Sequence, residues 1–576
     1  MERIIECVPN FSEGRNSQII NAIVEAVRGG ARKADGAGTG VKVLNVDPGE
    51  ATNRTVITFA GNPEAVVEAA YSAVAKAAEL IDMRHHHGAH PRSGATDVLP
   101  LIPISGVTLE ECAELARKLA ERIAKEQGIP CYCYEAAAFK PERKNLAVCR
   151  AGEYEALPQK MADPARHPDF GPEEYNDTVA KSGAINVGAR DFLIAVNFNL
   201  NTTSTRRANA IAFDVREKGR PKREGNPLTG KIVKDAEGNT VMIPGTLKGC
   251  KAIGWYIDEY GIAQVSMNIT DINVTPLHKA FEEVCRAAQA RGLRVTGTEI
   301  VGLVPKRSLI EAGKYFLEKQ QRSTGISEEE IIKIAVKSMG LDDLKPFDPK
   351  EKIIEYLLED EEEKKIRERL TRMSCKEFAV ETASESPAPG GGSISAYMGT
   401  LAAALGAMVA NLSSHKRGWD DRWKEFSDWA EQGQAQMKCL LALVDEDTAA
   451  FNRIMEALGM PKNSPQEKAA RAEALEDATL YATRVPLRTM KETLKVFPLL
   501  RAMALEGNPN SVSDAGVGAL AARSAVLGAQ LNVRINASSL KDREIAGQLC
   551  AEAEEIALRA MAAEREVLEI VNGKIS

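Results

Sequence analysis

Residues 252–269 read AIGWYIDEYGIAQVSMNI, and this stretch decides the fold class of the first part of the chain. Two runs rich in apolar and aromatic residues, 252–258 and 261–269, are separated only by a turn around Asp258-Glu259-Tyr260-Gly261. Because so short a connection joins antiparallel strands, the stretch predicts a β-hairpin. A purely parallel, doubly wound sheet is therefore excluded.

The hairpin belongs to a βαββαβ pattern that occurs twice along the chain. The first copy predicts strands and helices at 4–8, 16–29, 41–46, 54–60, 62–81 and 97–102, followed by a helix at 108–126 and a strand at 131–135. The second copy predicts 192–199, 204–218, the hairpin, 275–291 and 294–303. We expect an α+β region of two ferredoxin-like subdomains, with a ligand groove between them.

Beyond about residue 370 the predicted strands end and the chain is expected to be all-α. Alanine-rich stretches of helical period lie at 394–412, 424–458, 466–503, 514–531 and 543–572. We therefore divide the chain into 1–185, 186–344, a linker at 345–370 and a helical bundle at 371–576. Residues 220–245, rich in Pro, Gly and Lys, are expected to form a surface excursion.

Composition excludes several classes of protein. The 576 residues are 44% hydrophobic and 27% charged, with a net charge of −7, which suits a folded protein and disfavours a general nucleic-acid binder. There is neither an apolar run of membrane-spanning length nor a signal peptide, so we expect a cytoplasmic protein without a membrane partner. The ten cysteines show no CxxC pair and are expected to be reduced.

Four of the seven histidines fall in the segment His85-His86-His87-Gly88-Ala89-His90. A zinc site is not predicted, because the cluster lies in a Gly/Pro loop with no further ligand at a diagnostic distance. One of these histidines is instead expected to shuttle a proton. The residues alone leave open which one.

Two other clusters have a structural as well as a functional interpretation. Asp47, Asn53 and Arg54 lie around a strand connection, where they form either a solvated turn or a clamp for a carboxylate. Gly390-Gly391-Gly392-Ser393 leads directly into a helix whose free amides can bind an anion, but it lacks the Lys of a P-loop. The small residues that follow at helical spacing indicate either core packing or a helical dimer interface: Gly399, Ala403, Gly406 and Ala410.

Several long motifs resemble those of a known family. Residues 7–14 (CVPNFSEG), 52–56 (TNRTV), 87–98 (HGAHPRSGATDV) and 150–158 (RAGEYEALP) resemble glutamate formiminotransferase. Residues 388–393 (APGGGS), 443–447 (LVDED) and 532–536 (NVRIN) resemble formiminotetrahydrofolate cyclodeaminase. Their order resembles the bifunctional formiminotransferase-cyclodeaminase family over nearly the whole chain.

The resemblance implies two folate reactions at the end of histidine degradation. The formimino group of N-formimino-L-glutamate would pass to N5 of tetrahydrofolate, and the product would close to 5,10-methenyltetrahydrofolate with release of ammonia. Tetrahydrofolate, expected to be polyglutamylated, would be the co-substrate and no metal is implied. In the transferase the family's catalytic histidine falls on His90 and its supporting aspartate on Asp47. The remaining implied substrate or folate contacts are Asn10, Asn53, Arg54, Gly171, Pro172, Lys181, Gly183 and Arg190.

The chemistry of each step suits these residue types. One imidazole can take the proton from N5 and return it to the leaving amine, while a carboxylate orients the ring. Closure of the second ring needs a further acid/base group and polar side chains around the pterin. Asp445 and Asp447 lie two residues apart on a predicted helix, so only one of them is expected to face a given pocket. The other candidates there are Asp514, Asn532 and the segment Gly390-Gly391-Gly392-Ser393.

Two alternatives stay open. The helical region is either a cyclohydrolase-like enzyme or only an assembly module beside an active folate-dependent formyl- or formiminotransferase. A non-enzymatic folate scaffold is a third reading, which a His90 substitution would separate from an enzyme. The resemblance also implies a homo-oligomer, with dimers assembled into a larger ring. A basic groove is expected to retain the polyglutamate tail between the two sites: Lys181, Arg190, Arg206 and Arg207.

Overall fold

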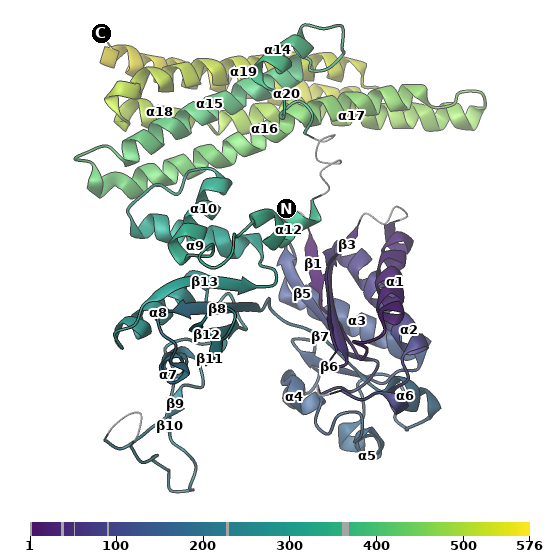
Figure 1. Cartoon of the computed structure of the whole chain (residues 1–576). Coiled ribbons are helices and arrows are strands. Elements are labelled where there is room, and N and C mark those ends of the chain that lie inside the picture. Colours follow the sequence, from purple (N-terminus) through teal and green to yellow (C-terminus); the bar gives the residue numbers. More distant parts are fainter. Residues whose placement is uncertain are drawn as a thin grey trace. The chain divides into compact units, whose positions relative to one another are not determined.

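The structure is a computed structural model that describes residues 3–35, 40–50, 52–88, 91–225, 230–359 and 368–575. The chain forms two compact units, each of which is described by itself. The first contains residues 1–311 and 339–359, and the second contains residues 312–338 and 360–576. The first unit is rich in sheet and the described part of the second is helical, as Figure 1 shows.

The N-terminal half of the first unit is a mixed sheet. Its strands are β1 (Ile4–Cys7), β2 (Asn10–Phe11), β3 (Val41–Gly49), β4 (Arg54–Gly61), β5 (Thr96–Ser105), β6 (Cys131–Glu135) and β7 (Ile185–Ala189). Strand β1 lies antiparallel between β4 and β5, and β3 pairs with β4. Strands β5, β7 and β6 then follow as parallel neighbours. The predicted strands of this half are confirmed, and β7 joins β6 to the rest of the sheet.

Three helices share one apolar core with this sheet: α1 (Ser17–Asp35), α2 (Pro63–Leu80) and α3 (Leu109–Gln127). The capping box predicted for α3 is confirmed. The Thr108 hydroxyl accepts from the Glu111 amide at 3.2 Å, and the Glu111 carboxylate accepts from the Thr108 amide at 2.7 Å. The helix ends at Gly128, whose φ of 66° is the left-handed conformation that favours glycine.

Between β6 and β7 the chain forms a long connection of short helices that the sequence did not predict. These are η2 (Pro141–Lys144), α4 (Leu146–Cys149), α5 (Leu157–Met161), η3 (Pro164–Arg166) and α6 (Asp177–Ser182). Buried charges hold the connection in place: Arg143 pairs with Asp169 at 2.6 Å, and the Lys160 ammonium lies 3.9 Å from the centre of the Tyr132 ring. Long-range contacts of this kind leave no local pattern in the sequence.

The C-terminal half of the first unit is a four-stranded antiparallel sheet in the order β11-β12-β8-β13. Its elements are β8 (Ile194–Leu200), α7 (Thr205–Val215), β11 (Cys250–Ile257), β12 (Ile262–Ile269), α8 (Leu277–Gln289) and β13 (Val295–Val301). In the predicted hairpin, Trp255 lies opposite Gln264 and Ile257 opposite Ile262. The surface excursion contains the two-stranded pair β9 (Arg220–Pro221) and β10 (Met242–Ile243).

Four helices follow β13 in the described part of the chain up to residue 359: α9 (Lys306–Lys319), α10 (Glu328–Met339), α11 (Pro349–Lys352) and α12 (Ile354–Leu358). The helical unit then continues with α14 (Cys375–Thr382), α15 (Gly391–Ser414), η4 (Asp420–Arg422), α16 (Trp423–Gly459), α17 (Pro465–Leu494), α18 (Phe497–Glu506), η5 (Pro509–Ser511), α19 (Val512–Ser539) and α20 (Arg543–Ile575). The stretch predicted at 466–503 is two helices, because Pro498 starts a new one in the first turn of α18.

Helix α15 is the central helix of this unit. Its small-residue stripe packs inside the subunit: a Cβ added to Gly399 or Gly406 would lie 2.7 Å from Thr493 Oγ1 or Leu499 Cδ2. Among the described residues, α15 is also the one helix long and apolar enough to cross a bilayer, and 61% of its apolar window is buried in the protein. Close packing in the core accounts for both features.

Candidate active sites

The first site lies in the N-terminal sheet region, around the histidine loop. The His86 ring is buried between two partners: its Nε2 lies 2.9 Å from the Asn53 carbonyl, and its Nδ1 accepts from Arg92 Nε at 3.3 Å. An arginine has only N–H donors, so Nδ1 is the acceptor and Nε2 carries the proton. Burial first, and the Arg92 charge further, lower the pKa of His86. His86 is therefore held as one neutral tautomer.

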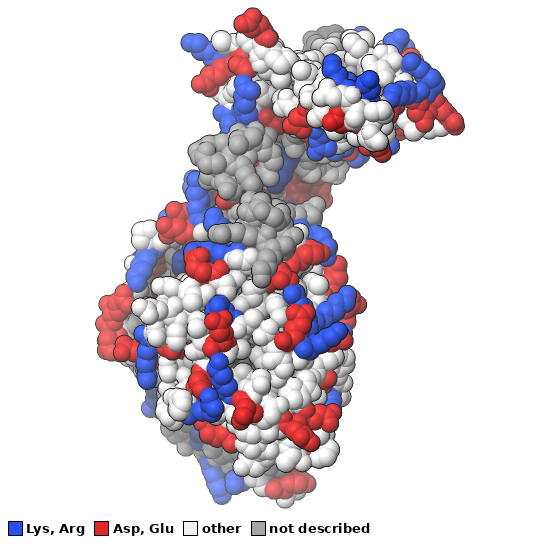
Figure 2. All heavy atoms as spheres, turned by 90° about the vertical axis from the view of Figure 1, so that its right-hand side faces the viewer, with Lys and Arg blue, Asp and Glu red and all other residues white. Residues whose placement is uncertain are grey.

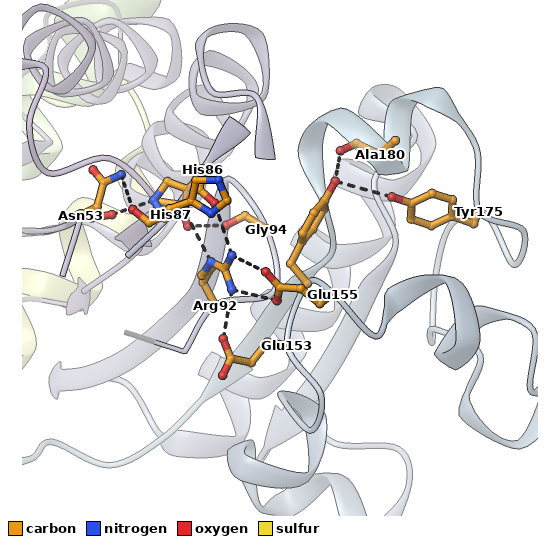
Figure 3. Close-up of polar contacts among 11 residues, drawn as sticks. Asn53, His86, His87, Arg92, Gly94, Glu153, Glu155, Tyr175 and Ala180 are labelled. Atoms are coloured by element: carbon orange, nitrogen blue, oxygen red, sulfur yellow. Dashed lines mark hydrogen bonds and ion pairs between the residues drawn. The ribbon is translucent and has the colours of Figure 1, made fainter. Parts of the chain in front are cut away.

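Arg92 is the hub of this network, as Figure 3 shows. It is only 7% exposed, yet its guanidinium binds Glu153 at 3.0 Å and Glu155 at 2.9 and 2.5 Å. It also donates to the His86 carbonyl at 3.3 Å. The two glutamates hold the charge of Arg92 and raise its pKa, with Glu155 contributing most. A cavity of about 440 Å³ lies beside the network, lined by His87, Gly88, Arg92, Gly152, Glu153 and Glu155.

Asn53 connects the histidine loop to the N-terminal motif. Its φ of 46° is left-handed, a conformation that asparagine tolerates better than most residues. Its side chain accepts from the Gly14 amide at 3.0 Å and donates to the His87 carbonyl at 3.0 Å. The sequence predicts that Asn53 binds substrate, and in the structure its two hydrogen bonds hold the histidine loop against the N-terminal motif.

A second polar group surrounds Asp97, which is 1% exposed. Its carboxylate accepts from the Ser93 amide at 2.9 Å and pairs with Arg150. Burial first, and the Arg150 charge second, lower the pKa of Arg54, while Asp97 and Asp47 oppose that shift. Arg54 and Asp47 therefore lie close enough to interact electrostatically, at the connection of β3 and β4.

A third group lies on β1 and at the end of β7. Burial raises the pKa of Glu6 to about 7, and the charge of Arg190 acts in the opposite direction. Arg190 also lowers the pKa of Glu135, which burial raises. Arg190 itself donates to the Asp191 carbonyl at 3.0 Å. Of the implied folate contacts, Arg190 thus interacts electrostatically with the buried Glu6 and the exposed Glu135.

The other implied folate contacts lie in the connection before β7. A Cβ on Gly183 would lie 2.3 Å from the Ser93 carbonyl, and one on Gly171 would lie 2.8 Å from the Ile129 carbonyl, so both glycines allow close backbone packing. Pro172 follows Gly171 at the surface of this connection. Lys181 donates to the Glu79 carbonyl at 2.8 Å. Asn10 lies on β2, opposite Val56 and Val98.

His90, which the family resemblance makes the catalytic residue, lies outside the described residues. Its neighbours in sequence are described: His85 and His87 are exposed, whereas His86 is buried. Among the residues that the structure describes, no group of three or more His, Cys, Asp or Glu is arranged to hold a metal ion.

The second site is a cavity of about 210 Å³ in the helical unit. It lies where the N-terminus of α15 meets α16 and α19. Its lining is Pro387, Ala388, Gly390, Gly391, Gly392, Asp447, Thr448, Phe451, Ile454, Ala482, Asn532 and Asn536. The glycine segment and both asparagines thus face the same space as one carboxylate, although they are far apart in the sequence.

The structure separates the two aspartates of α16. Asp445 accepts from the Leu370 amide at 2.8 Å and from the Thr371 hydroxyl at 2.7 Å, so it fixes the chain that enters the helical unit. Asp447 faces the cavity and accepts from the Ser393 hydroxyl at 3.1 Å. Burial raises the pKa of Asp447, against the effect of the Ser393 hydrogen bonds. Asp447 is therefore the acid/base candidate and Asp445 the structural residue.

Glycine is required beside this carboxylate. A Cβ on Gly392 would lie 2.1 Å from Asp447 Oδ1, and one on Gly391 would lie 3.3 Å from Asn532 Nδ2. Asn532 is held by a hydrogen bond to the Gly528 carbonyl at 2.9 Å. Asp514, in contrast, lies in the first turn of α19, about 27 Å along the helix from Asn532, and does not line the cavity.

Sequence reasoning missed the residues that hold the first site together. Arg92 was noted only as part of a motif, and the role of Glu153 and Glu155 was not foreseen. Their contacts with Arg92 join residues about sixty positions apart, which no local pattern reveals. The usable signal was the group of charged residues Arg150, Glu153 and Glu155 within the motif at 150–158.

Comparisons with known proteins cover both units of the chain. Family models match residues 4–190 (formiminotransferase domain, N-terminal subdomain), 195–359 (formiminotransferase domain) and 374–555 (formiminotransferase-cyclodeaminase). The formimidoyltransferase-cyclodeaminase of Mus musculus is 41% identical over 94% of this chain and 94% of its own length. The glutamate formimidoyltransferase of Streptococcus pyogenes is 37% identical over 55% of this chain and 94% of its own. The methenyltetrahydrofolate cyclohydrolase of Methylorubrum extorquens is 36% identical over 34% of this chain and 93% of its own.

The fold, the two sites and these matches define a two-domain enzyme of folate one-carbon chemistry. The chain belongs to the formimidoyltransferase-cyclodeaminase family. The formiminotransferase models cover residues 4–190 and 195–359, which include residues 312–338 of the second unit, and the formiminotransferase-cyclodeaminase model lies within the second unit at 374–555.

Proposed function

We propose that the sheet-rich unit transfers the formimino group of N-formimino-L-glutamate to N5 of tetrahydrofolate. The helical unit then closes the product to 5,10-methenyltetrahydrofolate and releases ammonia, which completes the degradation of histidine to glutamate. The single observation that carries this proposal is the separation of two polar sites in two units, each built from the motifs of one activity.

In the transfer step, His90 takes the proton of N5 as it attacks the formimino carbon and then protonates the departing glutamate amine. Asp47, exposed at the end of β3, supplies the carboxylate that stabilises the imidazolium. Arg54 is half-buried close to Asp47 and offers a planar fork for a substrate carboxylate. Asn10, Gly171, Pro172, Lys181, Gly183 and Arg190 complete the proposed contacts with folate and donor.

In the closure step, N10 attacks the formimino carbon and loses its proton, while the nitrogen of the formimino group leaves as ammonia. Burial raises the pKa of the Asp447 carboxyl above its ordinary value, which suits a group that gives and takes protons during the reaction. Ser393 holds this carboxyl from α15. Asn532 and the backbone of Gly390 to Gly392 line the same cavity and offer polar atoms to the pterin.

A second candidate function exists for the helical unit alone. The similarity to a protein named methenyltetrahydrofolate cyclohydrolase supports hydrolysis of the closed ring as the alternative activity. The Asp447 carboxyl would then activate the attacking water, and the reaction would release no ammonia. We favour the cyclodeaminase because the full-length relative shares both units in the same order.

We propose that the protein forms a homo-oligomer through an exposed apolar surface of the helical unit. Helices α15 and α19 pack side by side, and each presents apolar side chains to solvent along one face. These are Leu401, Met408 and Leu412 on α15, and Val517, Leu520, Leu531 and Ile535 on α19. Leu531 and Ile535 are 65% and 67% exposed, which indicates a surface that a second copy covers. Leu520→Glu should lower the mass measured by sedimentation.

The finer parts of the assignment are also proposals. We propose two ferredoxin-like transferase subdomains, at 1–185 and 186–344, with a linker at 345–370 before the cyclodeaminase domain. The strand order β11-β12-β8-β13 supports this arrangement in the second of them.

We propose a cytoplasmic protein that uses polyglutamylated folate, needs no metal and binds neither nucleic acid nor membranes. Charges of both signs are interspersed over the face shown in Figure 2, which disfavours binding of a nucleic acid there. The cationic residues proposed to retain the polyglutamate tail are Lys181, Arg190, Arg206 and Arg207.

The test follows three products at once. Purified protein receives formiminoglutamate and tetrahydrofolate, and glutamate, ammonia and the absorbance of methenyltetrahydrofolate are measured together. We expect equal amounts of all three. Glutamate without ammonia would reduce the helical unit to an assembly module, and hydrolysis of supplied methenyltetrahydrofolate faster than its formation would favour the cyclohydrolase.

A further inference from the structure

Strand β11 carries an exposed aromatic side chain on the sheet face opposite helix α7. This helix packs on β11 and β12, and a Cβ added to Gly254 would lie 2.1 Å from the Asn209 amide nitrogen of α7. Successive side chains of a strand point to opposite faces of the sheet, so Trp255 points away from α7. Trp255 is 39% exposed, and Ile253, on the same face of β11, is 54% exposed.

A chain of hydrogen bonds holds the Trp255 indole in place. Its Nε1 donates to Gln264 Oε1 at 3.0 Å, and Gln264 Nε2 donates to Asn199 Oδ1 at 2.8 Å. Asn199 Nδ2 then donates to Asp343 Oδ2 at 3.2 Å. An indole nitrogen only donates and a carboxylate only accepts, so the two ends of the chain fix the orientation of both buried amides. The indole is therefore ordered before a ligand arrives, which favours binding.

The next row of the same sheet face offers polar atoms that are not yet used. In this row Ile253 lies opposite Ser266, and Ser266 lies opposite Asn197. Asn197 is only 5% exposed, and its Nδ2 donates to Glu299 at 3.3 Å. Within the part of the chain that the structure describes, neither Asn197 Oδ1 nor the Ser266 hydroxyl makes a hydrogen bond. An acceptor and a hydroxyl therefore lie one row, about 7 Å, from the row of Trp255.

This surface suits a flat ring with polar edges better than it suits a second copy of the protein. The core of an interface between copies is mostly apolar, whereas the side chains beside the indole are amides and a hydroxyl. Flat heterocycles stack on exposed aromatic side chains, and a few fixed polar groups orient them. The pyrimidinone ring of a pterin is flat, and its N–H and carbonyl groups complement the Asn197 oxygen and the Ser266 hydroxyl.

We propose that Trp255 stacks on the pterin ring of tetrahydrofolate in the transferase, and that Asn197 and Ser266 bind the polar edge of that ring. The inference rests on the proposed function, which makes tetrahydrofolate the acceptor of the formimino group. In this role Trp255 binds the folate and does not contact N-formimino-L-glutamate. Loss of the indole should therefore raise the KM for one substrate and leave kcat nearly unchanged.

The kinetic test replaces Trp255 in the full chain. We expect Trp255→Leu to raise the KM for tetrahydrofolate about 10-fold, and Trp255→Phe, which keeps a smaller aromatic face, to raise it about threefold. The KM for N-formimino-L-glutamate and the transferase kcat should stay within about twofold of wild type in both variants. Tyr256→Leu is the matched control, because Tyr256 is the next residue of β11, is 41% exposed and points to the other face of the sheet. It should change none of the three constants by more than about twofold.

Tryptophan fluorescence tests the contact itself. The chain has four tryptophans, and the three besides Trp255 lie in the second unit: Trp419, Trp423 and Trp429. The difference in emission between wild type and Trp255→Phe is therefore the signal of Trp255. We expect 6-methyltetrahydropterin, which has the ring system without the tail of folate, to quench this signal, and p-aminobenzoyl-L-glutamate to leave it unchanged. Quenching by p-aminobenzoyl-L-glutamate, or by neither probe, would overturn the inference, and this measurement decides alone if Trp255→Leu does not fold.

These outcomes separate the inference from the function on which it rests. Failure of the wild-type protein to transfer the formimino group to tetrahydrofolate would contradict the proposed function. Normal transfer with an unchanged KM for tetrahydrofolate in folded Trp255→Leu, or with an equal rise in the KM of both substrates, would overturn only the role of Trp255. An unchanged KM together with a lower mass in sedimentation would instead assign this surface to a second copy of the protein.

Discussion

A single methyl group added at Gly392 should displace the cyclodeaminase carboxyl. The Cβ of Gly392→Ala would lie 2.1 Å from Asp447 Oδ1 and 2.5 Å from its Cγ. Ordinary carbon–oxygen contacts are about 3.4 Å or longer, so the carboxyl must move by roughly 1 Å. A shift of that size at a catalytic group typically costs about a hundredfold in kcat, or about 2.7 kcal/mol in the barrier.

The same substitution should not unfold the protein. Gly392 lies in the first turn of α15, where alanine is favoured over glycine by about 1 kcal/mol. We expect the thermal unfolding midpoint to change by no more than a few degrees, so any loss of activity reports on the site. The proper control is Gly547→Ala on α20, where an added Cβ meets no atom within 4 Å.

The assay follows methenyltetrahydrofolate absorbance from supplied 5-formiminotetrahydrofolate, with the transferase assayed on the same preparation. We expect Gly392→Ala to lose cyclodeaminase activity about a hundredfold while the transferase and the Gly547→Ala control stay at wild-type levels. Folded Gly392→Ala with more than half of the wild-type kcat would refute the placement of Asp447 in this site.

Three further predictions concern carboxyl groups. Asp445→Asn should lower thermal stability, because the amides and hydroxyl at residues 370–371 lose a charged acceptor. Asp447→Asn should abolish cyclisation and leave the Tm unchanged or higher. Thermal unfolding followed by circular dichroism, together with the cyclisation assay, distinguishes the two outcomes. Burial raises the pKa of Glu6 from 4.5 to about 7, so ionisation of Glu6 destabilises the folded state progressively as pH rises from 4.5 through 7. Glu6→Gln should therefore raise the free energy of unfolding of the first unit at pH 8 by up to about 3 kcal/mol, with no gain at pH 4. Urea unfolding at the two pH values measures this difference. Asp97→Ala should cost about 3–5 kcal/mol in the same urea assay, because Arg150 and the Ser93 amide lose a buried acceptor, and a loss below 1 kcal/mol would contradict that role.

The parts of the fold that the sequence predicts well are those with a local cause. The hairpin at 252–269 follows from a short turn between two apolar runs, and the α3 N-terminus follows from Thr108 and Glu111. The short helices between β6 and β7 were not predicted, because buried pairs such as Arg143 with Asp169 hold them through long-range contacts.

The candidate sites show the same division. Sequence motifs indicate the histidine loop and the pair Asp445 and Asp447, but only burial and partners decide which aspartate faces the cavity. Likewise, the role of His86 depends on Arg92 and Asn53, whose contacts arise when three separate segments meet. Residue types therefore predict the kind of chemistry at each site, whereas the role of an individual residue is decided by the fold.

The most direct test of the central claim, two independent active sites on one chain, is a paired assay of His90→Ala and Asp447→Asn. Each variant is given formiminoglutamate with tetrahydrofolate, and separately 5-formiminotetrahydrofolate, while glutamate and ammonia are measured. We predict that His90→Ala releases no glutamate but still frees ammonia from the supplied intermediate, and that Asp447→Asn releases glutamate but no ammonia. Loss of both products in either folded variant would contradict the account.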